Sequence, residues 1–179
     1  MVQNNKTVIY FLIKFFGTYL LLFLLYSFYL SKNQKSFELF ACAPITKTVA
    51  IQSQYLLNVM GYSSEIEQST SEMAINLFVN DILIARIIEG CNSVSIIILF
   101  VAFIVAFASG FKRTILFILF GSFIIYFVNI VRIVVIVIAI YKFPKLEGVL
   151  HNIVFPGIIY GITFLLWFLW VQKISRLKK

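Results

Sequence analysis

Four long and nearly uninterrupted apolar runs constrain this 179-residue chain more than any other feature. They cover about residues 8–30, 92–110, 114–141 and 152–171, and each comes near the roughly 20 helical residues that cross a bilayer. Because 61% of the residues are hydrophobic and only 12% are charged, a soluble core of this size cannot bury the apolar surface. The sequence therefore predicts an all-α polytopic membrane protein with about four transmembrane helices. The first run is too long for a signal peptide and lacks a small-residue cleavage site, so we expect a retained anchor.

The distribution of charge predicts the topology of these runs. Fifteen Lys and Arg face seven Asp and Glu. If all four runs cross, Lys6, the pair Lys112-Arg113 and the basic C-terminal tail lie on one side, and all acidic residues lie on the other. Since basic residues accumulate in cytoplasmic segments, both termini are expected in the cytoplasm, with residues 31–91 and 142–151 outside. No basic run is interleaved with aromatic residues, so nucleic acid is not an expected partner.

The long outer segment is expected to contain its own small structures. Pro44 to Gly61 reads as a short helix lying on the outer membrane interface, with an apolar face formed by Ile45, Val49, Leu56 and Met60. Tyr62 to Thr70 reads as a polar loop. The β-rich stretches 73–79 and 82–89 flank Asn80-Asp81, and this pattern predicts a short hairpin that leads into Cys91.

Three residues stand out chemically, and the expected topology brings each of them near the outer face. Cys91 begins the second apolar run, Arg132 lies in the outer half of the third, and His151, the only histidine, precedes the fourth. A charge inside a span is costly and marks a functional site by default, although Arg132 also fits a buried pairing between helices. Cys91 also fits an inert buried thiol, and His151 an ordinary interfacial residue.

The three residue types complement one another as a catalytic set. A thiolate is a strong nucleophile, and the first turn of a helix stabilises it. An imidazole takes up the thiol proton and returns it to an amine leaving group, and a guanidinium holds an oxyanion or a carboxylate. Cys91, His151 and Arg132 therefore predict acyl transfer through a thioester at the outer membrane surface. A non-enzymatic transporter or an export scaffold remains the alternative.

At these residues the chain resembles the exosortase/archaeosortase family. The resemblance covers residue 74 to the C-terminus and rests on Cys91 opening a span, Asn129-x-x-Arg132 late in the next, and His151 opening the last. It is closest to the short type F exosortases of Bacteroidetes, and residues 1–179 form a single domain of this kind. Many exosortases carry Cys-Ser-Gly or Cys-Ala-Gly where this chain has Cys91-Asn92-Ser93, so the sorting motif of the larger members is not transferred.

The resemblance implies a membrane-embedded cysteine transpeptidase or protease-like enzyme of the bacterial inner membrane. It would cleave C-terminal sorting tails of exported proteins at the periplasmic face and pass the acyl group to an acceptor such as a lipid or glycan. Hydrolysis and transpeptidation share one acyl-enzyme, so both remain open. The residues indicate no metal and no diffusible cofactor.

Supporting residues have weaker assignments. Asn129 lies on the same helical face as Arg132 and either orients it or bonds between helices. Asn92 and Ser93 either donate to an oxyanion or merely cap a helix. Cys42 reads as structural, although a Cys42–Cys91 disulfide is also possible in an oxidising periplasm.

Overall fold

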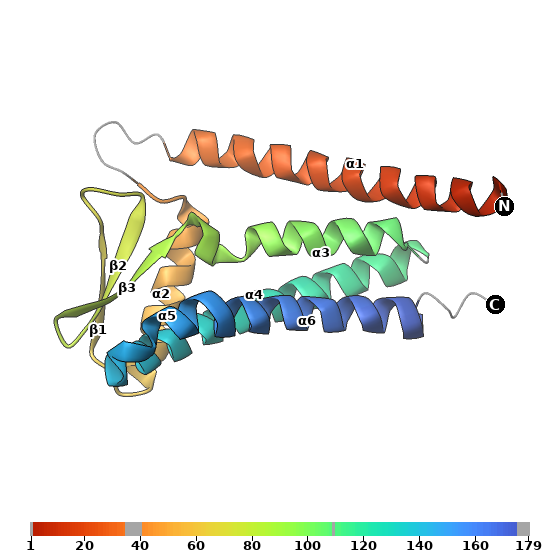
Figure 1. Cartoon of the computed structure of the whole chain (residues 1–179). Helices are drawn as coiled ribbons and strands as arrows, with labels where there is room; N and C mark the ends of the chain where they lie inside the picture. The colour runs from red at the N-terminus through yellow and green to blue at the C-terminus, as the bar shows by residue number, and fades with distance from the viewer. Residues whose placement is uncertain (1, 35–40, 109, 175–179) are drawn as a thin grey trace.

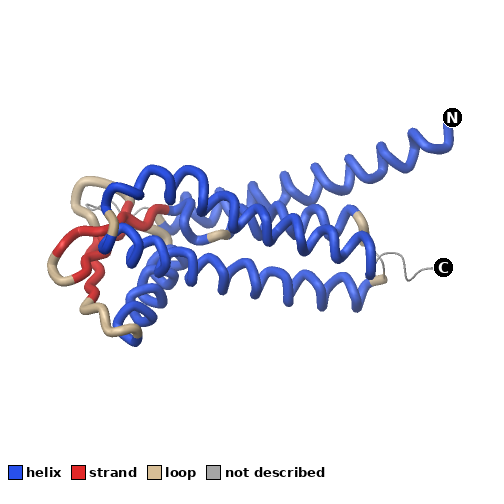
Figure 2. The backbone as a smooth tube through the Cα atoms, turned by 60° about the horizontal axis from the view of Figure 1, so that its bottom comes forward, coloured by secondary structure: helices blue, strands red, loops and turns tan. Residues whose placement is uncertain are grey.

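Four helices run lengthwise beside one another and carry a small sheet at one end (Figures 1 and 2). The computed structural model describes residues 2–34, 41–108 and 110–174. The helices are α1 (Val2–Asn33), α3 (Val94–Ala106), α4 (Phe111–Lys142) and α6 (Phe155–Leu169). The start of α1 and the end of α6 lie at the end of the bundle opposite the sheet. The described parts of segments 41–91 and 142–151, which the sequence predicts to share one side of the membrane, therefore lie together at the end with the sheet.

Two of the four helices have the length and apolar character to cross a membrane. These are α1, from Val8 onward, and α4, over its full 32 residues. The 13-residue α3 rises only about 20 Å, against about 30 Å of hydrocarbon, because a turn before it and another after it take up the ends of the predicted span. The 15-residue α6 is also short, although a π-helical stretch, Trp170–Ile174, extends it. The first and third predicted runs are confirmed as long helices, and the count of four spans stays a prediction.

Large aromatic and branched side chains fill the interior of the bundle. Phe100 and Ile104 from α3 pack against Ile125 from α4 and against Leu166 and Trp170 from the last helical segment. Trp170 is fully buried and donates from Nε1 to the carbonyl of Phe107 at 3.2 Å. This indole therefore fills the core and ties the last helical segment to the end of α3.

The sheet at the other end has three antiparallel strands in the order β1-β2-β3. The predicted hairpin is confirmed as β2 (Ala74–Val79) and β3 (Ile82–Ile88). Its two-residue turn has positive φ at Asn80 (49°) and Asp81 (62°), as the tight hairpin turn requires. The predicted polar loop is wrong, since it contains β1 (Ser64–Gln68). Its charged residues misled the prediction because an edge strand exposes one face to solvent.

Helix α2 (Pro44–Val59) matches the predicted short helix, and of its predicted apolar face only Val49 is fully buried within the protein. The residues that are buried are Thr46, Val49, Ala50, Ser53 and Leu57, whereas Met60 is 55% exposed. Small and hydroxylic residues form this face because it packs on the sheet and α4, sharing one core with Leu77 and Val137. The position of α2 at the membrane interface stays a prediction.

Candidate functional site

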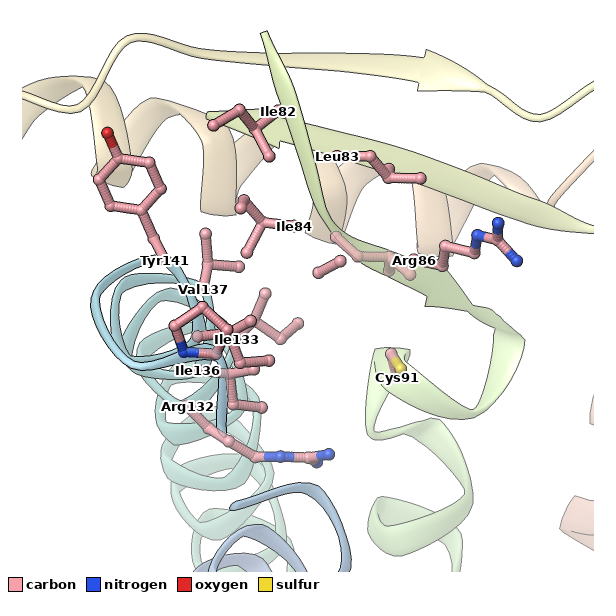
Figure 3. A pocket seen from close by; sticks show the side chains of 14 residues that line it. Ile82, Leu83, Ile84, Arg86, Cys91, Arg132, Ile133, Ile136, Val137 and Tyr141 are labelled. Carbon is pink, nitrogen blue, oxygen red and sulfur yellow. The ribbon is translucent and has the colours of Figure 1, made fainter. Parts of the chain in front are cut away.

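A cavity of about 660 Å³ lies between the sheet and α4, at the end of the bundle that carries the sheet (Figure 3). One wall is β3, which contributes six consecutive residues, 82–87. The opposite wall is an apolar face of α4, formed by Ile133, Ile136, Val137, Ile140 and Tyr141. Cys91 and Arg132 also line the cavity, and Figure 3 shows both side chains extending into it. Two of the three predicted site residues, Cys91 and Arg132, therefore share one cavity.

Cys91 is held in a tight turn that connects β3 to α3. The strand continues into a 3₁₀ turn, Glu89–Asn92, and α3 begins only at Val94. Cys91 therefore precedes the helix and does not occupy its first turn, so the expected stabilisation of its thiolate by that turn does not follow from this arrangement. Arg132 lines the same cavity as Cys91.

Hydrogen bonds to α1 and to the start of α2 hold the Glu89–Asn92 turn in place. The Glu89 carboxylate accepts from the backbone N–H of Ala43 and from the hydroxyl of Thr46. The Asn92 amide donates to the Tyr26 hydroxyl at 2.8 Å and to Thr46 Oγ1 at 3.0 Å. Since Asn92 is 1% exposed, a change at any of these groups leaves buried polar atoms without partners. This cluster ties the turn that contains Cys91 to α1 and to the start of α2.

Asn92 and Ser93 thus have clear structural contacts. Asn92 Oδ1 accepts from the N–H of Val94, the first residue of α3, at 3.0 Å. Ser93 adopts a left-handed conformation, with φ at 62°, and its hydroxyl donates to the carbonyl of Asn92 at 2.6 Å. Neither side chain is part of the cavity lining. Their role as oxyanion donors stays a prediction.

One buried amide joins Cys91 and Arg132. Asn129, in α4, donates from Nδ2 to the backbone carbonyl of Cys91 at 2.6 Å. Its Oδ1 accepts from Arg132 Nη1 at 3.3 Å. Asn129 is 1% exposed and therefore holds both partners in a fixed relation, which combines the two alternatives that the sequence left open for it.

His151 belongs to a π-helical turn, Leu150–Val154, just before α6. Its backbone is described, but its side chain lies outside the described part of the structure. The preceding residue, Leu150, packs against Ile136 and Ile140, which both line the cavity. The chain thus reaches the α4 wall of the cavity one residue before His151. Single π-helical turns are frequent at functional sites.

The second cysteine is separate from the cavity lining. Cys42 is 8% exposed and belongs to the core beneath the sheet. Burial, together with the negative charge of Glu89, raises the pKa of Cys42 to about 11. Both Cys42 and Cys91 are free thiols, so the structure contains no disulfide between them. Within residues 2–34, 41–108 and 110–174, no three Cys, His, Asp or Glu side chains gather into a possible metal site.

The fold and the cavity define a class of protein: a helical membrane protein in which a thiol and a guanidinium share a cavity beside a small sheet. Comparison with protein families gives a match to the model described as "Transmembrane exosortase (Exosortase_EpsH)" over residues 7–169. The chain belongs to the transmembrane exosortase family, whose members are sorting enzymes described in general as membrane cysteine transpeptidases. Neither a curated protein nor a solved structure matches the chain significantly.

Proposed function

We propose that this exosortase cleaves C-terminal sorting tails of exported proteins through a thioester on Cys91. The observation that carries the proposal is that the thiol of Cys91 and the guanidinium of Arg132 open into one cavity. Asn129 holds the backbone of the first residue and the side chain of the second. A nucleophile and an oxyanion-binding cation in one pre-formed space are the two groups that acyl transfer needs most.

The proposed reaction has two halves. His151 takes the proton of the Cys91 thiol, the sulfur adds to the carbonyl carbon of the scissile peptide bond, and Arg132 binds the resulting oxyanion. The C–N bond then breaks as the His151 imidazolium gives its proton to the departing amine, which leaves the thioester. In the second half an acceptor hydroxyl or amine, or water, attacks the thioester carbonyl and the C–S bond breaks. The thiol recovers a proton through His151.

The finer assignments belong to the same proposal. The enzyme is of the short type F, resides in the bacterial inner membrane with both termini in the cytoplasm, and acts at the periplasmic face. Its substrates are membrane-tethered proteins with C-terminal sorting tails, and its acceptor is a lipid or a glycan. The grouping of residues 41–92 with the segment before α6 at one end of the bundle supports a site on a single side of the membrane (Figure 1).

The decisive experiment compares the C-terminal tails of membrane-tethered proteins between the wild type and Cys91→Ala by proteomics in the native host. We expect tail peptides to persist in Cys91→Ala, because the thioester cannot form. Cys42→Ala is the matched control: it removes the other thiol, which does not line the cavity, and should leave the tails processed. Unchanged tails with a stably inserted Cys91→Ala protein would favour the transporter or scaffold.

A further inference from the structure

Strand β3 presents one of its edges to the cavity. In the order β1-β2-β3 it pairs with β2 on one side, and within the described residues no strand pairs with its other side. Successive side chains of a strand point to opposite faces. A cavity that touches the six consecutive residues 82–87 therefore borders the edge of β3, where backbone groups are exposed, and not one of its faces.

The register identifies which backbone groups point toward the open edge. The two-residue turn makes Val79 and Ile82 a hydrogen-bonded pair. Because such pairs alternate with pairs that do not exchange hydrogen bonds, Leu83, opposite Phe78, directs its N–H and C=O away from β2. The register then shifts by one residue between Leu77 and Phe78, which makes Ile84 the extra residue of a β-bulge, and bulges are common beside active sites.

The same alternation beyond the bulge gives Arg86, opposite Asn76, the same outward direction as Leu83. The edge of β3 beside the cavity therefore carries the unused N–H and C=O groups of two residues. Three residues after the strand ends, the chain reaches Cys91. An open strand edge thus leads directly to the proposed nucleophile.

We infer that the substrate binds as an extended strand added to the open edge of β3, so that its main chain is guided along the cavity to Cys91. This inference rests on the function proposed above and specifies how the substrate is recognised. Main-chain hydrogen bonds to Leu83 and Arg86 supply affinity in strand addition, and side-chain pockets supply specificity. Here the pocket is the apolar face of α4, which takes an apolar side chain.

The charged residues of the cavity restrict the charge that the bound peptide can carry. Its lining contains two arginines, Arg86 and Arg132, and no acidic residue. Arg86 is paired with Glu72 at 2.8 Å on an exposed surface, whereas Arg132 is half-buried and extends into the cavity. The bound segment is therefore an uncharged or acidic peptide with apolar side chains, and any basic cluster of the tail lies outside the cavity.

The test removes one open-edge N–H and leaves the sheet intact. Leu83→Pro deletes a donor that the pairing with β2 does not use, and proline is tolerated at such edge positions. Leu83→Ala is the matched control, since it trims the same side chain but keeps the N–H. For a tail identified in the proteomic comparison, we expect processing to slow about tenfold in Leu83→Pro, because one hydrogen bond is lost, and about two- to threefold in Leu83→Ala.

The outcomes separate the two levels of the proposal. If Leu83→Pro processes the tail as fast as Leu83→Ala while Cys91→Ala blocks it, strand addition is wrong and the catalytic function stands. If Cys91→Ala also processes the tail, the catalytic function itself fails. Equal rates of maleimide labelling at Cys91 in both Leu83 variants, each made in a Cys42→Ala background, show that the cavity is intact.

A cross-linking series decides the case in which Leu83→Pro perturbs the cavity. Leu83→Cys in a Cys42→Ala, Cys91→Ala background is oxidised with copper phenanthroline against tails that carry single cysteines at successive positions. An added strand gives its strongest cross-link at the tail position opposite Leu83, weaker ones two residues to either side and none at the positions between, because side chains alternate along a strand. A helical period, or no cross-link at any position, overturns the inference.

Discussion

The two ends of the molecule are held together by different means. In the bundle, α3, α4 and α6 meet through large apolar side chains, among them Phe100 and the fully buried Trp170. At the end with the sheet, the turn that contains Cys91 is fixed by polar groups of segments far apart in the chain, as in the bond from Ala43 to Glu89. Apolar packing is tolerant of detail, whereas each buried hydrogen bond demands one particular partner. The end with the sheet therefore tolerates fewer substitutions than the bundle, and in return Cys91 is held in one defined position.

The largest effect on stability is expected where the polar cluster is broken. Glu89→Ala removes the acceptor for Ala43, Thr46 and Asn92 at once. Because hydrogen bonds to a charged group contribute about 1.5–3 kcal/mol each, we expect a loss of about 3 kcal/mol or more in the free energy of unfolding, measured by denaturant titration in detergent. Glu89→Gln keeps an acceptor oxygen and should lose less than half as much.

Cys42 provides a local readout of the same change. In a Cys91→Ala background we expect slow alkylation of Cys42, because burial raises its pKa to about 11 and little thiolate exists near pH 8. Glu89→Ala and Glu89→Gln remove the same charge beside this thiol, so a faster alkylation in the alanine variant alone measures opening of the structure. Equal alkylation rates in the two variants would show that the hydrogen bonds of Glu89 do not hold this end together.

A smaller effect is expected in the bundle, where shape decides. A Cβ at Gly121 would lie 2.3 Å from Cζ of Phe100, and this ring is fully buried. Gly121→Ala should therefore cost about 1–3 kcal/mol, and Phe100→Leu in the same chain should recover part of that loss. The control is Gly17→Ala in α1, where no atom lies within 4 Å and alanine should be neutral or stabilising. Equal losses at both glycines would contradict close packing of α3 on α4.

The same contrast explains what the sequence could predict. The two long helices could be predicted because each is a long apolar run in the sequence. The hairpin could be predicted from its two β-rich stretches and from Asn80-Asp81 between them. The buried face of α2 did not follow, because Thr46 and Ser53 are buried through contacts made by distant segments. The partners of Glu89 did not follow either, because Ala43 and Thr46 lie more than 40 residues before it in the sequence.

The candidate site was predictable to a similar degree. Cys91 and Arg132 were selected by residue type and by their places in the apolar runs, and the cavity contains both. The two contacts of Asn129 depend on the packing of α4 against the turn that contains Cys91. The open edge of β3 depends on the register of the strands. No local pattern encodes such contacts, although a lone asparagine in an apolar run marks a position that needs a partner.

The smallest predicted effect concerns Ser93, at the boundary between the two regions. Its φ of 62° is the left-handed conformation that glycine adopts without cost, and glycine is the residue that the family resemblance leads one to expect there. In an ordinary helix interior alanine is more stable than glycine by about 1 kcal/mol. At position 93 we expect the reverse, with Ser93→Gly more stable than Ser93→Ala by about 1 kcal/mol, because both lose the hydroxyl and only alanine keeps the strained Cβ. An alanine variant as stable as the glycine variant in denaturant titration would show that the left-handed turn after Cys91 is not maintained in solution.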